Sequence, residues 1–135
     1  MVDVLIKNGL LLTMRGEGVG TVEDGAVAIE GNRIVAVGKT QEVEKQFANA
    51  DRTFDARGKA VLPGFVDAHV HTGMTILRGQ GQDVPEIEWM LKTMGPFGRH
   101  TTGEHRLKAS ALGVLEGLKS GTTCFGEIGV GSEVV

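Results

Sequence analysis

The chain has 135 residues, of which 41% are hydrophobic and only 4% aromatic, and it carries a formal net charge of −3. This length fits one ordinary domain or two small ones, and the 21 glycines indicate many tight turns around an aliphatic core. The mild charge, without a basic cluster, argues against nucleic acid as a partner, and no apolar run approaches the length of a membrane span. A single cysteine, Cys124, excludes an internal disulfide and fits a reducing compartment, so we expect a soluble, cytoplasmic protein.

Short β-strands separated by turns are predicted for the beginning of the chain. Residues 2–7 alternate and are rich in β-branched side chains, Asn8-Gly9 is a turn signal, and residues 10–14 form a second apolar run. This pattern predicts a hairpin. The polar and glycine-rich residues 15–25 predict a loop.

A second hairpin and a short helix are predicted next. Gly31-Asn32 suits the two central positions of a tight turn between strands over residues 26–30 and 33–37. Thr40 suits the N-cap of a helix over residues 40–48. The first part of the chain is therefore predicted to be mainly antiparallel β-structure.

The character of the chain changes near residue 60. Residues 60–66 are continuously apolar, which is typical of strands in parallel sheets that are covered on both faces. We therefore place a domain boundary there, with one domain over residues 1–60 and a second over residues 61–135.

Two helices are predicted in the second domain. A helix over residues 85–94 is expected to end at Gly95-Pro96. A longer helix is predicted over residues 102–120, because Thr101 and Glu104 have capping-box spacing before it. One apolar stripe runs along this helix and contains Leu107, Ala111, Val114, Leu115 and Leu118.

A buried strand is predicted after the longer helix, over residues 122–125, and Cys124 is expected to be a buried side chain within it. A strand, a helix and a strand in this order predict a βαβ unit, which is the repeat of α/β barrels.

His69 and His71 are the strongest functional signal in the sequence. They occupy positions i and i+2 at the end of the apolar strand, so their side chains are expected to point the same way. Two such imidazoles can bind one metal ion from the same side, or can simply lie on a polar sheet face. Their place at the end of a strand favours the metal site, because active sites of barrels gather at the carboxyl ends of strands. Asp67 shares their strand face and either orients a ligand or makes a structural hydrogen bond.

Five segments of the chain carry a family resemblance. They are VLIKNG at residues 4–9, AIEGNRIVAVG at 28–38, LPGFVDAHVH at 62–71, MTILRG at 74–79 and SGTTCF at 120–125. The first three resemble the opening of the amidohydrolase superfamily. Together with the last two they resemble its branch of cytosolic metal-dependent deaminases and chlorohydrolases, which includes S-adenosylhomocysteine and methylthioadenosine deaminases.

The resemblance implies an α/β fold in which a metal-dependent (β/α)8 TIM barrel carries a small β-sandwich. This chain would supply the N-terminal sandwich segment and the first βαβ unit, because a barrel needs about 250 residues. His69 and His71 match the first two metal ligands of the family, and the catalytic residues are expected downstream of Val135. His100 and His105 are expected to be surface or structural residues.

The chemistry that the resemblance implies is metal-assisted hydrolysis of a C–N or C–Cl bond on a heterocyclic ring, with deamination favoured. One divalent metal is expected, zinc first, with iron, nickel or manganese as alternatives. The expected partners are a small heterocyclic substrate, the rest of the barrel or a partner chain, and further copies of the chain in a homo-oligomer, with no nucleic acid and no membrane. This chain alone is expected to be inactive. The alternative is a non-catalytic fragment or a binding module.

Two further residues are candidate substrate contacts. Trp89 lies in the segment that caps the pocket in similar deaminases, where it would wall a heterocycle or else anchor the core of its helix. Glu127 follows the last predicted strand and would lie at the active-site end of a barrel. Residues 95–99 lack the acidic residue that binds a ribose in similar deaminases, so the resemblance does not specify a nucleoside.

Overall fold

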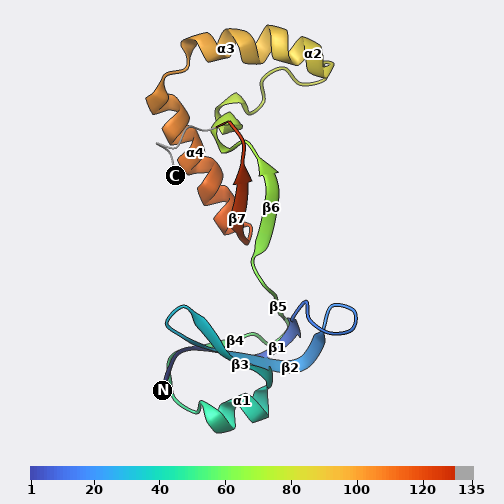
Figure 1. The fold of residues 1–135 in the computed structure, drawn as a ribbon, viewed down its shortest axis with the longest axis vertical. Helices are drawn as coiled ribbons and strands as arrows, with labels where there is room; N and C mark the ends of the chain where they lie inside the picture. Colours follow the sequence, from blue (N-terminus) through green and yellow to red (C-terminus); the bar gives the residue numbers. More distant parts are fainter. Residues whose placement is uncertain (130–135) are drawn as a thin grey trace. The chain divides into compact units, whose positions relative to one another are not determined.

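The computed structural model describes residues 1–129, which fall into two compact units (Figure 1). The first unit is Met1–Pro63, and the second begins at Gly64. Both units contain strands and helices, so the predicted mixed α/β class is confirmed. Within the described part of the chain, no helix is long and apolar enough to cross a membrane.

A five-stranded sheet forms the first unit. Its strands are β1 (Val2–Leu12), β2 (Thr21–Glu30), β3 (Arg33–Lys39), β4 (Ala50–Asp55) and β5 (Ala60–Val61). Strand β1 pairs antiparallel with β2 and parallel with β4 and β5, and β2 pairs antiparallel with β3. The predicted turn at Gly31-Asn32 is confirmed, and Gly31 has the positive φ of 57° that such a turn requires.

One face of this sheet is covered by the helix α1 (Thr40–Gln46), which contacts β2 and β3. The two elements enclose a small aliphatic core made of Val2, Leu5, Ala26, Ala28 and Val43. Alanines on β2 let the helix approach the sheet closely, and Val43 is the helix residue that fills the space between them. The first unit therefore has a hydrophobic core of its own.

The predicted hairpin at Asn8-Gly9 is wrong, because β1 runs through both residues. Asn8 has a φ of 62°, but it lies where the pairing of β1 with β2 shifts register, as at a β-bulge. Gly9 is needed for a close approach, since a Cβ there would lie 2.9 Å from Val61 Cγ2 and 3.0 Å from Ala56 Cβ. The true partner strand, β2, begins at Thr21, so the predicted loop over residues 15–25 is shorter than expected.

Two other predictions for this region need correction. Thr40 begins α1 but does not cap it, because its hydroxyl oxygen accepts a hydrogen bond from the Asn8 amide at 3.0 Å and the N-cap is Lys39. The apolar run over residues 60–66 is not one strand. Its first two residues pair with β1, and a separate strand begins at Phe65. Pro63 lies between them and has no N–H to donate to a ladder.

The second unit pairs two parallel strands, β6 (Phe65–Val70) and β7 (Thr122–Glu127). The helical elements between them are η1 (Thr72–Leu77), α2 (Glu86–Trp89), η2 (Met90–Met94), α3 (Gly95–His100) and α4 (Gly103–Lys119). Helix α4 lies beside the strand pair, and it contacts η1 and β7 (Figure 1). The carboxyl ends of β6 and β7 therefore lie next to each other, and η1 starts from that edge.

The helix predicted over residues 85–94 does not end at Gly95-Pro96. It passes through η2, which is a π-helical turn, into α3, and Pro96 lies in the first turn of α3. A proline inside a helix removes one hydrogen bond of the ladder, and here the π turn directly before Pro96 is where the ladder departs from its regular pattern. The sequence rule that proline stops a helix fails here for that reason.

The cap predicted for the longest helix is one residue out of place. Thr102, not Thr101, is the N-cap of α4, and its hydroxyl accepts the His105 amide at 3.2 Å. The His105 ring completes the box by accepting the Thr102 amide at 3.3 Å, where Glu104 was expected to act. His105 therefore has the structural role that was expected of it.

Among the described residues, α4 buries few side chains, and the burial predicted for β7 is wrong. The side chains that α4 buries are Ala109 and Ser110, whereas Leu107, Leu115 and Leu118 of the predicted stripe are exposed. Cys124 is exposed as well. The next residue, Phe125, packs close to Gly117 of α4, so the alternation of the strand turns Cys124 to the face that α4 does not cover.

Candidate metal centre and adjoining cavity

The rings of His69 and His71 converge at the carboxyl end of β6. His69 lies in the strand and His71 directly follows it. Their Nε2 atoms are 3.2 Å apart, and the ring planes meet nearly edge to face, with an interplanar angle of 75°. His69 is exposed and His71 is half-buried. The strand alternation thus brings two nitrogen atoms together at an accessible edge of the second unit.

The ring of His71 is fixed by a contact from β7. Its Nδ1 donates a hydrogen bond to the backbone carbonyl of Ile128, the residue after that strand. A carbonyl only accepts, so this contact places the proton on Nδ1 and leaves the lone pair on Nε2. That lone pair lies on the nitrogen that faces His69, at a distance at which it can accept a hydrogen bond from His69 Nε2.

Asp67 supports the same strand end through the backbone. Its Oδ1 accepts a hydrogen bond from the His69 amide at 3.2 Å. The contact is made to the main chain of His69 and not to its ring. Asp67 is half-buried, two residues before the exposed His69. Its carboxylate therefore helps to shape the end of β6 on which the histidine lies.

The two Nε2 atoms fit two positions of one zinc ion. Two nitrogens bound at about 2.0–2.1 Å with a near-tetrahedral angle are separated by roughly 3.3 Å. The observed 3.2 Å matches that separation. Among the described residues, no group of three or more histidines, cysteines or carboxylates gathers to hold a metal. The chain therefore offers half of a tetrahedral ligand set at this position.

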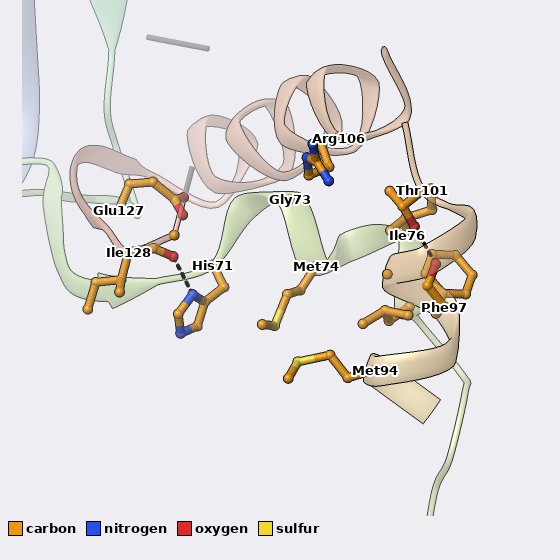
Figure 2. Close-up of a pocket in the computed structure, with 13 residues that line it drawn as sticks. His71, Gly73, Met74, Ile76, Met94, Phe97, Thr101, Arg106, Glu127 and Ile128 are labelled. Atoms are coloured by element: carbon orange, nitrogen blue, oxygen red, sulfur yellow. Dashed lines mark hydrogen bonds between the residues drawn. The ribbon is translucent and has the colours of Figure 1, made fainter. Parts of the chain in front are cut away.

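A cavity of about 240 Å³ opens beside His71 (Figure 2). His71 lies toward one end of the view and Phe97 toward the other, with the side chains of Met74 and Met94 between them. Arg106 of α4 and Glu127 of β7 also line the cavity. The walls are thus largely apolar, and the polar groups lie at the side of the histidine and of α4.

Of the two predicted substrate contacts, Glu127 is the one that the structure brings close to the histidine pair. Its Oε2 accepts a hydrogen bond from the Thr72 amide at 2.8 Å, directly after His71. Its Oε1 is buried and has no hydrogen-bond partner among residues 1–129. A buried carboxylate oxygen without a donor is costly, and such groups often mark functional sites.

Trp89 is not among the residues that line this cavity. Its Nε1 donates to the Gln80 carbonyl at 3.2 Å, and its ring packs on Gly81, where a Cβ would lie 2.7 Å from Trp89 Cδ1. The structure therefore brings Asp67, His69, His71 and Glu127 to one strand edge and leaves Trp89 in α2, outside the lining of the cavity.

Sequence reasoning missed the apolar walls of the cavity. Met94 and Phe97 lie three residues apart, which places them on one face only if the helix continues through Gly95-Pro96. Because the helix was predicted to end at Gly95-Pro96, Met94 and Phe97 were not recognised as neighbours on one face. Met74 comes from η1, whose fold could not be read from a glycine-containing loop.

The short helix η1 is held on α4 by two contacts. Arg78 makes a paired hydrogen bond to Glu116, with distances of 2.9 and 2.5 Å, and the Thr75 hydroxyl donates to the Ala109 carbonyl at 2.7 Å. The hydrogen bond from Arg78 lowers the pKa of Glu116 and raises that of Arg78 itself. Both charged groups are exposed to solvent, so the pair adds little stability but fixes the direction of η1.

Converging imidazoles at the carboxyl end of a parallel strand are an arrangement suited to a metal-binding α/β protein. The model of the amidohydrolase family matches residues 60–134, which is more than half of the sequence. The chain belongs to the amidohydrolase family. A second model, an imidazolonepropionase-like composite domain of bacteria, matches residues 25–50.

Curated relatives of the chain are deaminases. A 5'-deoxyadenosine deaminase of Methanococcoides burtonii is 40% identical over 95% of this chain and 28% of its own length. A 5-methylthioadenosine/S-adenosylhomocysteine deaminase of Desulforamulus reducens is 36% identical over 93% of the chain and 28% of its own length. The predicted resemblance to this branch is confirmed, and the chain spans about 28% of the length of the relatives it matches.

Solved structures with the same fold include zinc-bound enzymes. An adenosine deaminase from Xanthomonas campestris with bound zinc matches with a TM-score of 0.91 and 32% identity, over 98% of this chain and 30% of that one. An atrazine chlorohydrolase from Arthrobacter aurescens, complexed with zinc, matches with a TM-score of 0.75 and 25% identity, over 90% and 28%. The described units therefore have the architecture of one part of these hydrolases.

Proposed function

We propose that this chain supplies the first metal-binding portion of an amidohydrolase that hydrolyses a C–N bond on a small heterocyclic ring. The observation that carries the proposal is the convergence of His69 and His71 Nε2 to 3.2 Å in a chain of this family. The deaminase relatives support deamination, and the chlorohydrolase neighbour is a reason to test C–Cl hydrolysis beside it.

The proposed fold of the whole protein is a TIM barrel with a small β-sandwich. Residues 1–60 would form the N-terminal part of the sandwich, and residues 61–135 would begin the barrel with its first strand, helix and strand. The parallel pairing of β6 with β7, with α4 between them, supports the barrel assignment. The apolar groove on the first unit, lined by Ile29, Ile34 and Val37 among others, supports a second sheet packing there.

The proposed metal is zinc, held in part by Nε2 of His69 and Nε2 of His71, with iron, nickel or manganese as alternatives. When bound, such an ion lowers the pKa of water toward neutrality and polarises the bond that is hydrolysed. The chain's own contribution is to hold the two imidazoles so that their Nε2 atoms converge. Ile128 keeps the proton of His71 on Nδ1, away from the shared position.

The cavity beside His71 is the proposed binding place for the heterocycle. Met74, Met94 and Phe97 offer flat and deformable apolar walls that suit an aromatic ring. Glu127 is proposed to contact the substrate through its unpartnered Oε1, which can accept a hydrogen bond from a ring or exocyclic N–H. Trp89 remains a proposed substrate contact, outside the residues that line this cavity.

The remaining parts of the site are proposed to come from outside the described residues. The catalytic residues are expected beyond Val135, and the rest of the barrel or a partner chain is needed to supply them. The exposed apolar residues of α4, Leu107, Leu115 and Leu118, support such a completing surface, and copies of the chain in a homo-oligomer are a further expected contact. Without those parts the chain is proposed to be inactive, and a non-catalytic binding module is the alternative.

Metal content and ammonia release test the proposal together. The assembled enzyme should bind one zinc per chain and release ammonia from adenine nucleosides. His69→Ala and His71→Ala should lower zinc affinity by more than the 10–100-fold typical of groups that only support a ligand. The matched control is His100→Ala, which removes an exposed histidine at the end of α3 and should change neither quantity. Retention of zinc by both variants would overturn the ligand assignment.

A non-catalytic module is the other outcome of the same assay. If the assembled protein binds zinc through both histidines but releases neither ammonia from nucleosides nor chloride from a chlorotriazine, the hydrolase function is wrong and the binding module is favoured.

A further inference from the structure

The carboxyl end of β7 contacts the chain on both sides of His71. The Ile128 carbonyl accepts the proton of the His71 ring, and the Glu127 carboxylate accepts the amide of Thr72, the next residue along. These contacts join segments separated by 57 and 55 residues in sequence. One short segment thus controls both the ring and the backbone of a proposed metal ligand.

The position of the Ile128 carbonyl is itself fixed by the strand pair. The Ile128 amide donates to the Val70 carbonyl at 3.0 Å, which extends the pairing of β6 and β7 by one step. Gly126 permits this close pairing, because a Cβ there would lie 2.4 Å from the Ala68 carbonyl oxygen. The acceptor for the His71 ring is therefore part of the ladder and does not depend on a mobile side chain.

The Glu127 carboxylate fixes the turn that follows His71. Thr72 is only 4% exposed, and its amide is one of the first in η1, where a helix has no internal acceptor to offer. The Glu127 Oε2 supplies that acceptor at 2.8 Å, and the Met74 amide then donates to the His71 carbonyl at 2.9 Å. Loss of the carboxylate would leave the Thr72 amide without this acceptor and would free the backbone next to His71.

We propose that Glu127 is a positioning residue, which anchors the Thr72 amide so that the His71 ring keeps its Nδ1–H on the Ile128 carbonyl and its Nε2 toward His69. This inference rests on the proposed function, in which His71 is a metal ligand. It gives Glu127 a role beyond substrate contact, because one oxygen holds the backbone while the other has no hydrogen-bond partner among residues 1–129.

Two substitutions that change either the length or the charge of the Glu127 side chain separate its positioning role from a substrate contact. Glu127→Gln keeps the length of the side chain and a carbonyl oxygen for the Thr72 amide, but it loses the charge. Glu127→Asp keeps the charge and shortens the reach by one methylene. Positioning predicts that Gln is tolerated and Asp is not, whereas a charged substrate contact predicts that Gln is the more harmful change. The matched controls are Glu104→Gln and Glu104→Asp, at an exposed glutamate of α4.

The experiment measures the His71 tautomer by ¹⁵N NMR in the metal-free protein, and zinc affinity by competition with a chelator. We expect wild type and Glu127→Gln to hold the Nδ1–H form, with zinc affinities within about twofold of each other. Glu127→Asp should show a mixture of tautomers and about tenfold weaker zinc binding, the lower end of the range for groups that support a ligand.

Two results would overturn this inference, and a third would overturn only the proposed function. An unchanged tautomer and unchanged zinc affinity in Glu127→Asp would show that Glu127 does not position His71. Glu127 would be a substrate contact alone if two results came together. Glu127→Gln would raise KM while zinc affinity stayed full, and Glu127→Asp would leave the His71 tautomer intact. If His71→Ala keeps its zinc while Glu127→Asp still shifts the tautomer, the positioning holds and the ligand assignment fails.

Discussion

The two units of the chain differ in how much of their apolar surface they bury. Of the ten hydrophobic residues buried within the described part of the chain, eight lie in the first unit, and only Leu77 and Ala109 lie in the second. The second unit instead exposes leucines along α4 and places its histidines at an open strand edge. The first unit is thus built around a core of its own, whereas the second leaves most of its apolar side chains exposed.

Truncating one leucine in each unit should give the largest difference between them. Leu5 is 3% exposed and belongs to the first core, so Leu5→Ala should cost about 2–5 kcal/mol in the stability of that unit. Leu115 is 53% exposed, so Leu115→Ala should change stability by about 0.5 kcal/mol or less. Hydrogen exchange followed by mass spectrometry resolves the two units. Equal losses would show that the α4 face is already covered.

A glycine in the second unit should show an intermediate effect. Gly126→Ala would bring a Cβ against the backbone of Ala68, which cannot move aside cheaply, so a loss of about 1–3 kcal/mol is expected. Because β7 would separate from β6, zinc affinity should fall in the same variant. Gly103→Ala is the control, since a Cβ there meets nothing within 4 Å. If denaturant unfolding shows no difference between the two variants, the close pairing is not required.

Acid should have the smallest effect, and mainly on the first unit. The side-chain hydrogen bond from Arg57, with that from Asn8, holds the pKa of Asp55 well below its usual value of 3.8. A carboxyl whose pKa is depressed in the folded state adds stability above its unfolded pKa and loses it as the pH falls below that value. Asp55→Asn should therefore flatten the fall in stability of the first unit as the pH drops below about 4. If urea unfolding of Asp55→Asn gave the same dependence of stability on pH as the wild type, Asp55 would not contribute to the acid sensitivity of the first unit.

Local patterns in the sequence predicted the order of elements better than their ends. The strand, helix and strand over β6, α4 and β7 follow from apolar runs and a capping signal, and both are local properties. Asn8-Gly9 misled the prediction because a positive φ serves a bulge as well as a turn. Gly95-Pro96 misled it because the helix continues through the proline by way of a π turn, in which the ladder is already irregular.

The histidine pair could be predicted because both residues lie within one strand period. The rest of the site could not, because it joins distant segments. The contact between His71 and Ile128 spans 57 residues, and the cavity adds Met74, Met94 and Arg106 from three different helices. Cys124 was predicted to be buried because no basic residue stands beside it in the sequence, but its burial depends on which face of β7 is covered. Such features depend on how distant segments pack together, and this cannot be read from a single sequence.

The central claim is that His69 and His71 bind the same metal ion, and X-ray absorption at the zinc edge tests it most directly. In the zinc-loaded protein we predict imidazole scattering from at least two nitrogens at about 2.0–2.1 Å. One imidazole should be lost in His69→Ala and one in His71→Ala, and none in His100→Ala. A zinc environment of oxygen ligands alone, or a spectrum unchanged by both substitutions, would contradict the account.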